Sequence, residues 1–340
     1  MTDKRLLLAA TFAIAIAILV VLVLRIDLAA TFSQLRRVGF PGAAVILLDL
    51  TVALLGPLLA WHILMRADGI RITFGTTLAS SLMGHSVNLI SPMMYFGGEG
   101  IRTFHIARVT GTSRRRVLAT IMAAEFQQLT ALSATIVAAL VIVAGSSSRP
   151  NGMPVSWMVG GTLSLVLIVG FILCALLLDL RLLPRTVDLL MRCGIFPGRL
   201  ARVREAAADV EQVVRSLLVR HRLPFLVSQG LIFLSPLAQF VLPSIFFRFV
   251  GEPQPTLAQL SSCFVLVQLL FMFPTTPAGL GVYEGGLVGI FRLHGWAIPD
   301  GFAYAILVRL DDVLFSIVGA AILTRFGLMN FLEEEGEAIP

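Results

Sequence analysis

The sequence predicts an all-α polytopic membrane protein, with about six full spans and two broken, re-entrant helical hairpins in inverted-topology repeats. The first observation is composition: 57% of the residues are hydrophobic, 14% are charged, and the mean hydropathy is +0.91. A soluble domain would carry about 25% charged residues. The second is a pair of Pro/Gly-rich interruptions within apolar segments, each followed by a carboxylate. The third is the distribution of arginines among the loops, which indicates the side on which each loop lies.

The full spans are predicted at residues 6–24, 41–64, 117–143, 157–178, 223–247 and 303–323. Lys4 and Arg5 precede the first of them, as in a signal peptide. No convincing small-residue cleavage site follows near Arg25, so we expect an uncleaved helix. Residues 25–40 are predicted as a short polar connection to the second span.

A long polar region separates the fourth and fifth spans. Its segment 199–218 places apolar residues at helical spacing, which predicts an amphipathic helix lying on the cytoplasmic surface. We therefore divide the chain into a first helix with its connection (1–40), a first membrane repeat (41–145), a linking span with the amphipathic helix (146–221), a second membrane repeat (222–326) and an acidic tail (327–340).

The net charge of +6 comes from arginine, since Lys4 is the only lysine. Arginines in the loops of a membrane protein set its topology and contact lipid headgroups, so no nucleic-acid partner is expected. Cys174, Cys193 and Cys263 are isolated and show neither metal-ligand spacing nor a disulfide framework. We expect no metal and no cofactor.

The two interruptions share an order of residues. Pro92 precedes Glu99 by the same separation by which Pro277 precedes Glu284. This shared register is the basis of the two repeats. A carboxylate at membrane depth is costly and is functional by default. The alternative for Glu99 and Glu284 is a structural ion pair with an arginine.

The second interruption also contains residues that disfavour a helix. Pro277 cannot donate a helical hydrogen bond, and Gly279 and Gly281 each lower helix stability by roughly 1 kcal/mol. Irregular backbone at membrane depth persists only where protein or a water-filled cavity covers it, which makes the segment a candidate site. The alternative is that the glycines only permit close helix packing.

The arginines predict the orientation. With the N-terminus in the cytoplasm, the basic cluster between Arg102 and Arg116 also falls there, so residues 76–99 must enter and return from the cytoplasmic side. Residues 257–291 must then enter and return from outside, and both termini are cytoplasmic. Each loop falls on the same side of the membrane if each hairpin instead crosses fully as two short helices. We expect a multi-pass protein of the cell (inner) membrane.

The run Pro-Ala-Gly-Leu-Gly-Val-Tyr-Glu ending at Glu284 resembles a late signature of the flippase-like membrane proteins named for the transmembrane region of lysylphosphatidylglycerol synthase. That signature reads Pro-Gly-Gly-Leu-Gly-Val, a variable residue and Glu, so Ala278 replaces one glycine. The earlier run from Gly98 to Arg102 resembles the family's Gly-(Glu/Asp)-x-x-Arg element.

Glu125 resembles a carboxylate in the family's next helix, where a Glu-Arg-x-x-Asp run is common. Here Phe126 and Leu129 stand at the Arg and Asp positions. The resemblance extends over roughly the whole membrane chain.

The resemblance implies a protein that moves, or helps process, a lipid with a charged headgroup: a phospholipid, an aminoacylated phospholipid, a hopanoid or a polyprenyl-linked lipid. No segment is long or polar enough for the soluble aminoacyl-transfer domain of the synthase members, so we expect a lipid flippase or transporter rather than an enzyme. The alternatives are a membrane subunit or enzyme acting on a lipid-linked substrate, and a structural partner of an envelope-biosynthesis enzyme.

In this interpretation Arg102 and Arg309 would bind a lipid phosphate as charge-assisted donors. The repeat register places Glu125 near the position equivalent to Arg309, which predicts that these two side chains approach each other. His85 and Asn88 are expected to line the first hairpin. The full set of candidate substrate-binding residues is Glu99, Arg102, Glu125, Pro277, Gly279, Gly281, Glu284, Arg309 and Asp312.

Overall fold

The computed structural model describes residues 24, 27–90, 97–146, 155–178, 180–192, 197–271, 276 and 279–327. Helices make up all the regular secondary structure in this part of the chain, which confirms the all-α prediction. Most of the predicted first span, Pro277 and the acidic tail after Gly327 lie outside the described residues.

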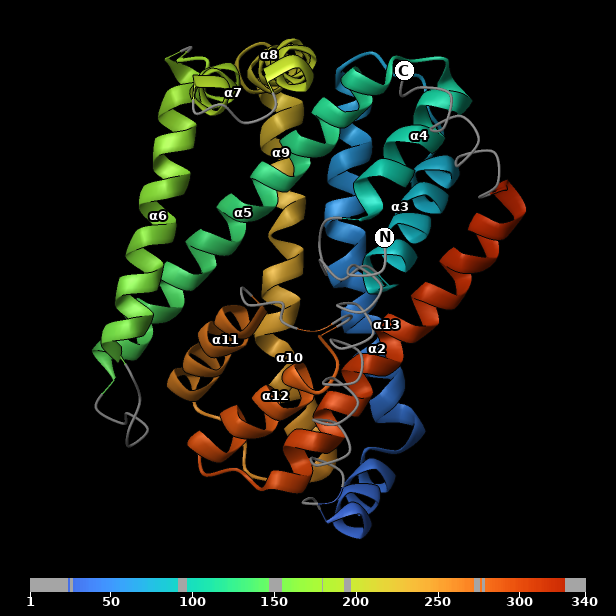
Figure 1. Cartoon of the computed structure of the whole chain (residues 1–340). Coiled ribbons are helices and arrows are strands. Elements are labelled where there is room, and N and C mark those ends of the chain that lie inside the picture. The colour runs from blue at the N-terminus through green and yellow to red at the C-terminus, as the bar shows by residue number, and fades with distance from the viewer. Residues whose placement is uncertain are drawn as a thin grey trace.

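Three helical stretches of the described chain are long and apolar enough to cross a membrane. They are α2 (Leu28–Ala67), α5 (Arg114–Gly145), and the consecutive helices α9 (Arg222–Ile232) and α10 (Leu234–Val250). Helix α6 (Val155–Leu177) contains a shorter apolar stretch and lies beside α5 (Figure 1). Helix α13 (Ile298–Phe326) is of similar length to these, but Arg309 and two aspartates interrupt its apolar character.

Within the predicted polar connection before the second span, the chain is helical from Leu28 onward. Asp27 precedes the helix, and its Oδ1 accepts the N–H of Ala30 at 3.0 Å, which satisfies an otherwise free donor of the first turn. The helix bends at Gly39, whose φ is 58°, two residues before Pro41. The bend thus lies close to the point where the apolar span was predicted to begin.

Two pairs of helices occupy opposite halves of the molecule (Figure 1). Helices α3 (Phe74–Ile90) and α4 (Gly98–Thr110) lie side by side near the end where α2 finishes. Helices α11 (Leu257–Phe271) and α12 (Val282–Leu293) lie in the other half. Helix α13 begins next to α12 and runs toward the first pair, where it packs along α3.

Helix α8 (Pro197–Val219) and helix α7 (Leu182–Arg192) lie across one end of the bundle (Figure 1). The apolar face of α8 was expected to rest on the membrane surface. Val210, Val214 and Leu217 are instead buried in one core cluster with Val117 and Ile121 of α5. The apolar face of α8 therefore packs against the bundle. The sequence pattern of one helix cannot distinguish such packing from burial in lipid.

An aromatic core holds α12 against α10 and α13. The ring of Phe291 is fully buried and lies 5.8 Å from Phe247 in a stacked arrangement and 5.3 Å from Tyr304. Tyr283 and Leu287 of α12 belong to the same cluster. Because these contacts fix the rotation of α12, they determine which face of its first turn meets α13.

Candidate functional site

The first turn of α12 is closed by a carboxylate. Gly281 has a φ of 77°, and its N–H donates to Oε2 of Glu284 at 2.6 Å. On the other side of Gly281, the hydroxyl of Thr276 donates to the carbonyl of Leu280 at 2.9 Å. A carboxylate is favoured at this end of a helix because the backbone N–H groups there are otherwise without partners. Glu284 therefore stabilises the local backbone, independently of its contacts with other side chains.

The second oxygen of Glu284 binds Arg309 of α13. Arg309 Nε lies 2.6 Å from Glu284 Oε1, and the two side chains are only 16% and 6% exposed. The guanidinium also lies over the ring of Tyr283, 4.8 Å from its centroid. The structure thus contains the ion pair that was the alternative explanation for Glu284, and the pair is largely shielded from water.

Arg309 also contacts Asp312 on its own helix, and Asp312 in turn faces His85 on α3. Its Nη1 lies 3.4 Å from Oδ2 of Asp312, one turn further along α13. The other carboxylate oxygen of Asp312 lies 3.8 Å from Nε2 of His85 on α3. A line of polar groups therefore runs from the second interruption to the first hairpin.

The first hairpin is built around a close approach of α3 and α4. Asn88 of α3 accepts the N–H groups of Gly97 and Gly98 through its Oδ1, at 2.9 and 2.6 Å, and so caps the start of α4. A Cβ on Gly98 would collide with the backbone of Gly84, so the two helices touch at these residues. Asn88, predicted to line this hairpin, thus has a structural role there.

Arg102, in the first turns of α4, forms the second ion pair. Its Nη1 lies 3.5 Å from Oε1 of Glu125 on α5, and these side chains are 20% and 44% exposed. The N–O distance in this pair is longer than in the pair of Glu284 and Arg309, and its side chains are more exposed. Its net contribution to stability is therefore expected to be smaller. Arg102 also packs against α3, because a Cβ on Gly84, the neighbour of His85, would collide with its side chain.

These contacts form one group, which we call the interhelical ion cluster. It joins α3, α4 and α5 to α12 and α13, and consists of His85, Arg102, Glu125, Glu284, Arg309 and Asp312. Glu99 lies one turn before Arg102 on α4. The predicted approach of Glu125 to Arg309 was wrong, because Glu125 pairs with Arg102 and Arg309 with Glu284. The contact of His85 with Asp312 and the ring of Tyr283 under Arg309 were not predicted.

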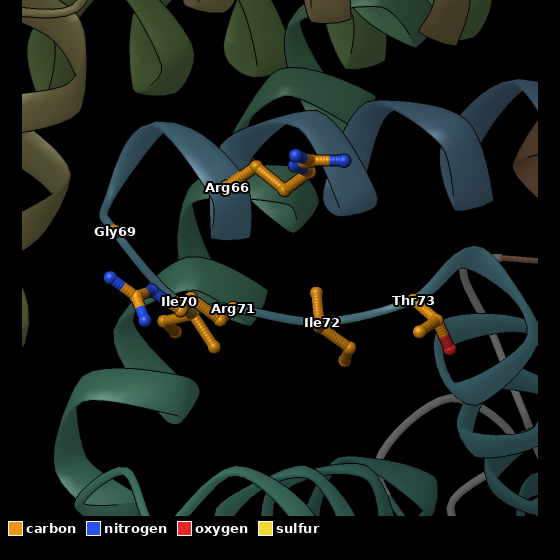
Figure 2. Close-up of a pocket in the computed structure, with 6 residues that line it drawn as sticks. All are labelled: Arg66, Gly69, Ile70, Arg71, Ile72 and Thr73. Carbon is orange, nitrogen blue, oxygen red and sulfur yellow. The ribbon is translucent and has the colours of Figure 1, made fainter.

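A separate hollow of about 580 Å³ lies at the turn between α2 and α3 (Figure 2). It includes no residue of the interhelical ion cluster. The guanidinium groups of Arg66 and Arg71 extend in opposite directions along the turn and do not converge on a common point. The hollow is therefore not a candidate for the site predicted from the sequence.

Long apolar helices around a group of mutually paired charges define the class of this chain, a multi-pass α-helical membrane protein. Within that class it belongs to the family of the lysylphosphatidylglycerol synthase TM region, whose match covers residues 8–319. Comparison with curated proteins and with solved structures gives no match. The family assignment indicates a membrane protein of lipid or envelope metabolism or transport, and confirms the resemblance drawn from the late signature.

The conformation of Gly281 leads to the first prediction. Leucine at this position would have to adopt a positive φ, which costs about 1–3 kcal/mol, at a residue that is buried. Gly281→Leu is therefore expected to displace Glu284 from the first turn of α12 and to lower the melting temperature in detergent. Gly289→Leu is the control, since Gly289 lies exposed in the same helix with nothing near its Cβ position. Equal melting temperatures for the two variants would contradict the prediction.

Proposed function

We propose that this protein is a flippase or transporter that moves a lipid with a charged headgroup between the leaflets of the cell membrane. The observation that carries the proposal is the interhelical ion cluster, which connects the two helical hairpins. Charged groups buried in a membrane protein commonly mark the path of a polar substrate. A headgroup in transit would meet fixed charges here rather than hydrocarbon.

The two arginines are suited to a phosphate. Nε of Arg102 and Nη2 of Arg309 are buried, and neither has a hydrogen-bond partner among the described residues. Buried donors are normally satisfied, so a missing partner at such a group calls for a water or a ligand. A phosphate oxygen is a strong partner for a guanidinium. Both arginines already hold carboxylates, which would release them when the phosphate arrives.

The two hairpins would serve as gates to opposite faces. In the proposed arrangement α3 and α4 enter and return from the cytoplasmic side, α11 and α12 enter and return from outside, and both termini are cytoplasmic. Inverted repeats of this kind commonly place substrates where their broken helices meet. The positions of the two helix pairs in opposite halves of the molecule support this assignment (Figure 1).

This arrangement predicts four labelling results in a variant without native cysteines. Single cysteines at Thr73 and Ser113, which flank the first hairpin, should both react with a membrane-impermeant maleimide from the cytoplasmic side. Single cysteines at Thr256 and Ala297, which flank the second, should both react from outside. All four positions are exposed. Labelling of Thr73 and Ser113 from opposite faces would contradict the re-entrant model.

The test of function uses purified protein in vesicles of phosphatidylethanolamine and phosphatidylglycerol that contain a trace of headgroup-labelled phosphatidylglycerol. We expect the label to become accessible to a membrane-impermeant quencher faster than in protein-free vesicles, with no change in its covalent structure by mass spectrometry. A covalently altered lipid would favour the enzyme alternative. If this lipid does not move, the assay is repeated with a polyprenyl phosphate. A result equal to protein-free vesicles for both lipids would contradict the proposal.

A further inference from the structure

The carboxylates around Arg309 outnumber the cations. Glu284 and Asp312 both contact this one arginine, and Asp311 is the neighbour of Asp312 on α13. Oδ1 of Asp311 is buried without a hydrogen-bond partner in the described part of the chain. An excess of ionised carboxylates is costly away from water, and the usual response of such a group is to take up a proton.

Asp312 and His85 are the members of this group placed to share a proton between two helices. Their Oδ1 and Nε2 atoms lie 3.8 Å apart, and Nε2 of His85 is buried without a hydrogen-bond partner among the described residues. The ring of Phe315 meets His85 edge-on at 6.4 Å. The hydroxyl of Ser86, next to His85, donates to the carbonyl of Ser316 at 2.8 Å, which holds α3 and α13 together at this level.

The charged groups that face this pair lie on two further helices, α4 and α12, and on α13 itself. Arg309 lies 3.4 Å from Asp312 and 2.6 Å from Glu284. The side chain of Arg102 lies against Gly84, the neighbour of His85 on α3. The pair therefore stands between the two arginines that the proposed function assigns to the lipid phosphate. A change in the partner of either arginine changes the electrostatic environment of the pair.

We propose that Asp312 and His85 form a proton-binding site whose occupancy is coupled to the lipid, a step that rests on the proposed function. When a phosphate binds Arg309, Asp312 loses its nearest cation and a negative charge is added nearby. Both changes favour a proton on the Asp312–His85 pair. By linkage, a bound proton favours the phosphate to the same extent. The lipid and the proton would then move together, and a proton gradient would drive the lipid.

The coupling predicts a result that simple equilibration of lipid would not give. Wild-type protein is placed in the same vesicles with the labelled phosphatidylglycerol distributed equally between the leaflets, and a pH gradient is imposed. We expect the label to accumulate in the leaflet facing the alkaline side and to return to equality when an ionophore removes the gradient. Protein-free vesicles under the same gradient give the background, which is subtracted.

Wild-type protein that moves the lipid but leaves it equally distributed under the gradient would overturn this inference and leave the proposed function intact. Absence of movement of both phosphatidylglycerol and the polyprenyl phosphate, with or without the gradient, would instead overturn the proposed function. The two failures are therefore distinguishable in one set of vesicles.

The site is tested with Asp312→Asn, which is expected to lose the gradient-driven accumulation. Asp209→Asn is the matched control, because Asp209 pairs with Arg115 at 3.0 Å in an exposed contact outside the cluster. His85→Gln gives a second measurement on the other partner if Asp312→Asn does not fold. Accumulation as large as in wild type in a folded Asp312→Asn or His85→Gln protein would overturn the assignment to this pair.

Discussion

Replacing Glu284 with glutamine is expected to abolish lipid movement while the protein still folds. Glutamine keeps an oxygen that can accept the N–H of Gly281, so the first turn of α12 retains its cap. The change removes the charge that faces Arg309 at 2.6 Å. Breaking a buried ion pair commonly costs about 3–5 kcal/mol, and we expect less here because Asp312 still contacts the same arginine.

The measurement is melting temperature and vesicle transport on the same preparation. Glu125→Gln is a comparison within the cluster, since its pair with Arg102 is longer and its side chain is 44% exposed. We expect a smaller loss of stability for Glu125→Gln than for Glu284→Gln. A Glu284→Gln protein with lowered melting temperature and unchanged transport would assign Glu284 to the scaffold. The substrate site would then have to be sought around Arg102 and Glu125.

Much of the candidate site could be predicted from residue types. Prolines, glycines and carboxylates inside apolar segments are costly at membrane depth, so their positions in the sequence are enough to indicate the two hairpins. The same reasoning singled out Arg102, Glu284 and Arg309, and the structure brings all three into one cluster. Such residues can be singled out from the sequence because ionisable groups are rare within membrane spans and usually face the interior of the helix bundle.

The partners within the cluster could not be predicted in the same way. The alignment of the two repeats predicted that Glu125 and Arg309 approach each other. Such an alignment, however, shows only which positions are equivalent and not which side chains are in contact. The contacts depend on how α13 rotates and where it crosses α3, which tertiary packing decides. The burial of α8 against α5 was missed for the same reason: an amphipathic pattern identifies the apolar face and leaves its partner open.

The contact that decides the crossing of α3 and α13 leads to the last prediction. A Cβ on Gly319 would collide with the carbonyl of Leu82 and with the hydroxyl of Ser86, so the two helices can pack this closely only because residue 319 has no side chain. Three residues before it, the carbonyl of Ser316 accepts the hydroxyl of Ser86 at 2.8 Å. The same crossing places Asp312 3.8 Å from His85.

Gly319→Val is therefore expected to force α3 and α13 apart, to break the Ser86–Ser316 hydrogen bond and to separate His85 from Asp312. Overpacking in a well-packed interior typically costs about 1–3 kcal/mol, and we expect the upper end because one of the opposing atoms belongs to the backbone. The melting temperature and the monodisperse fraction in size-exclusion chromatography should both fall, and lipid movement should be lost. Gly289→Val, at an exposed glycine with open space around it, should behave as wild type. If the two variants melt at the same temperature, α3 and α13 do not meet at Gly319, and the link between the two halves of the interhelical ion cluster must be made elsewhere.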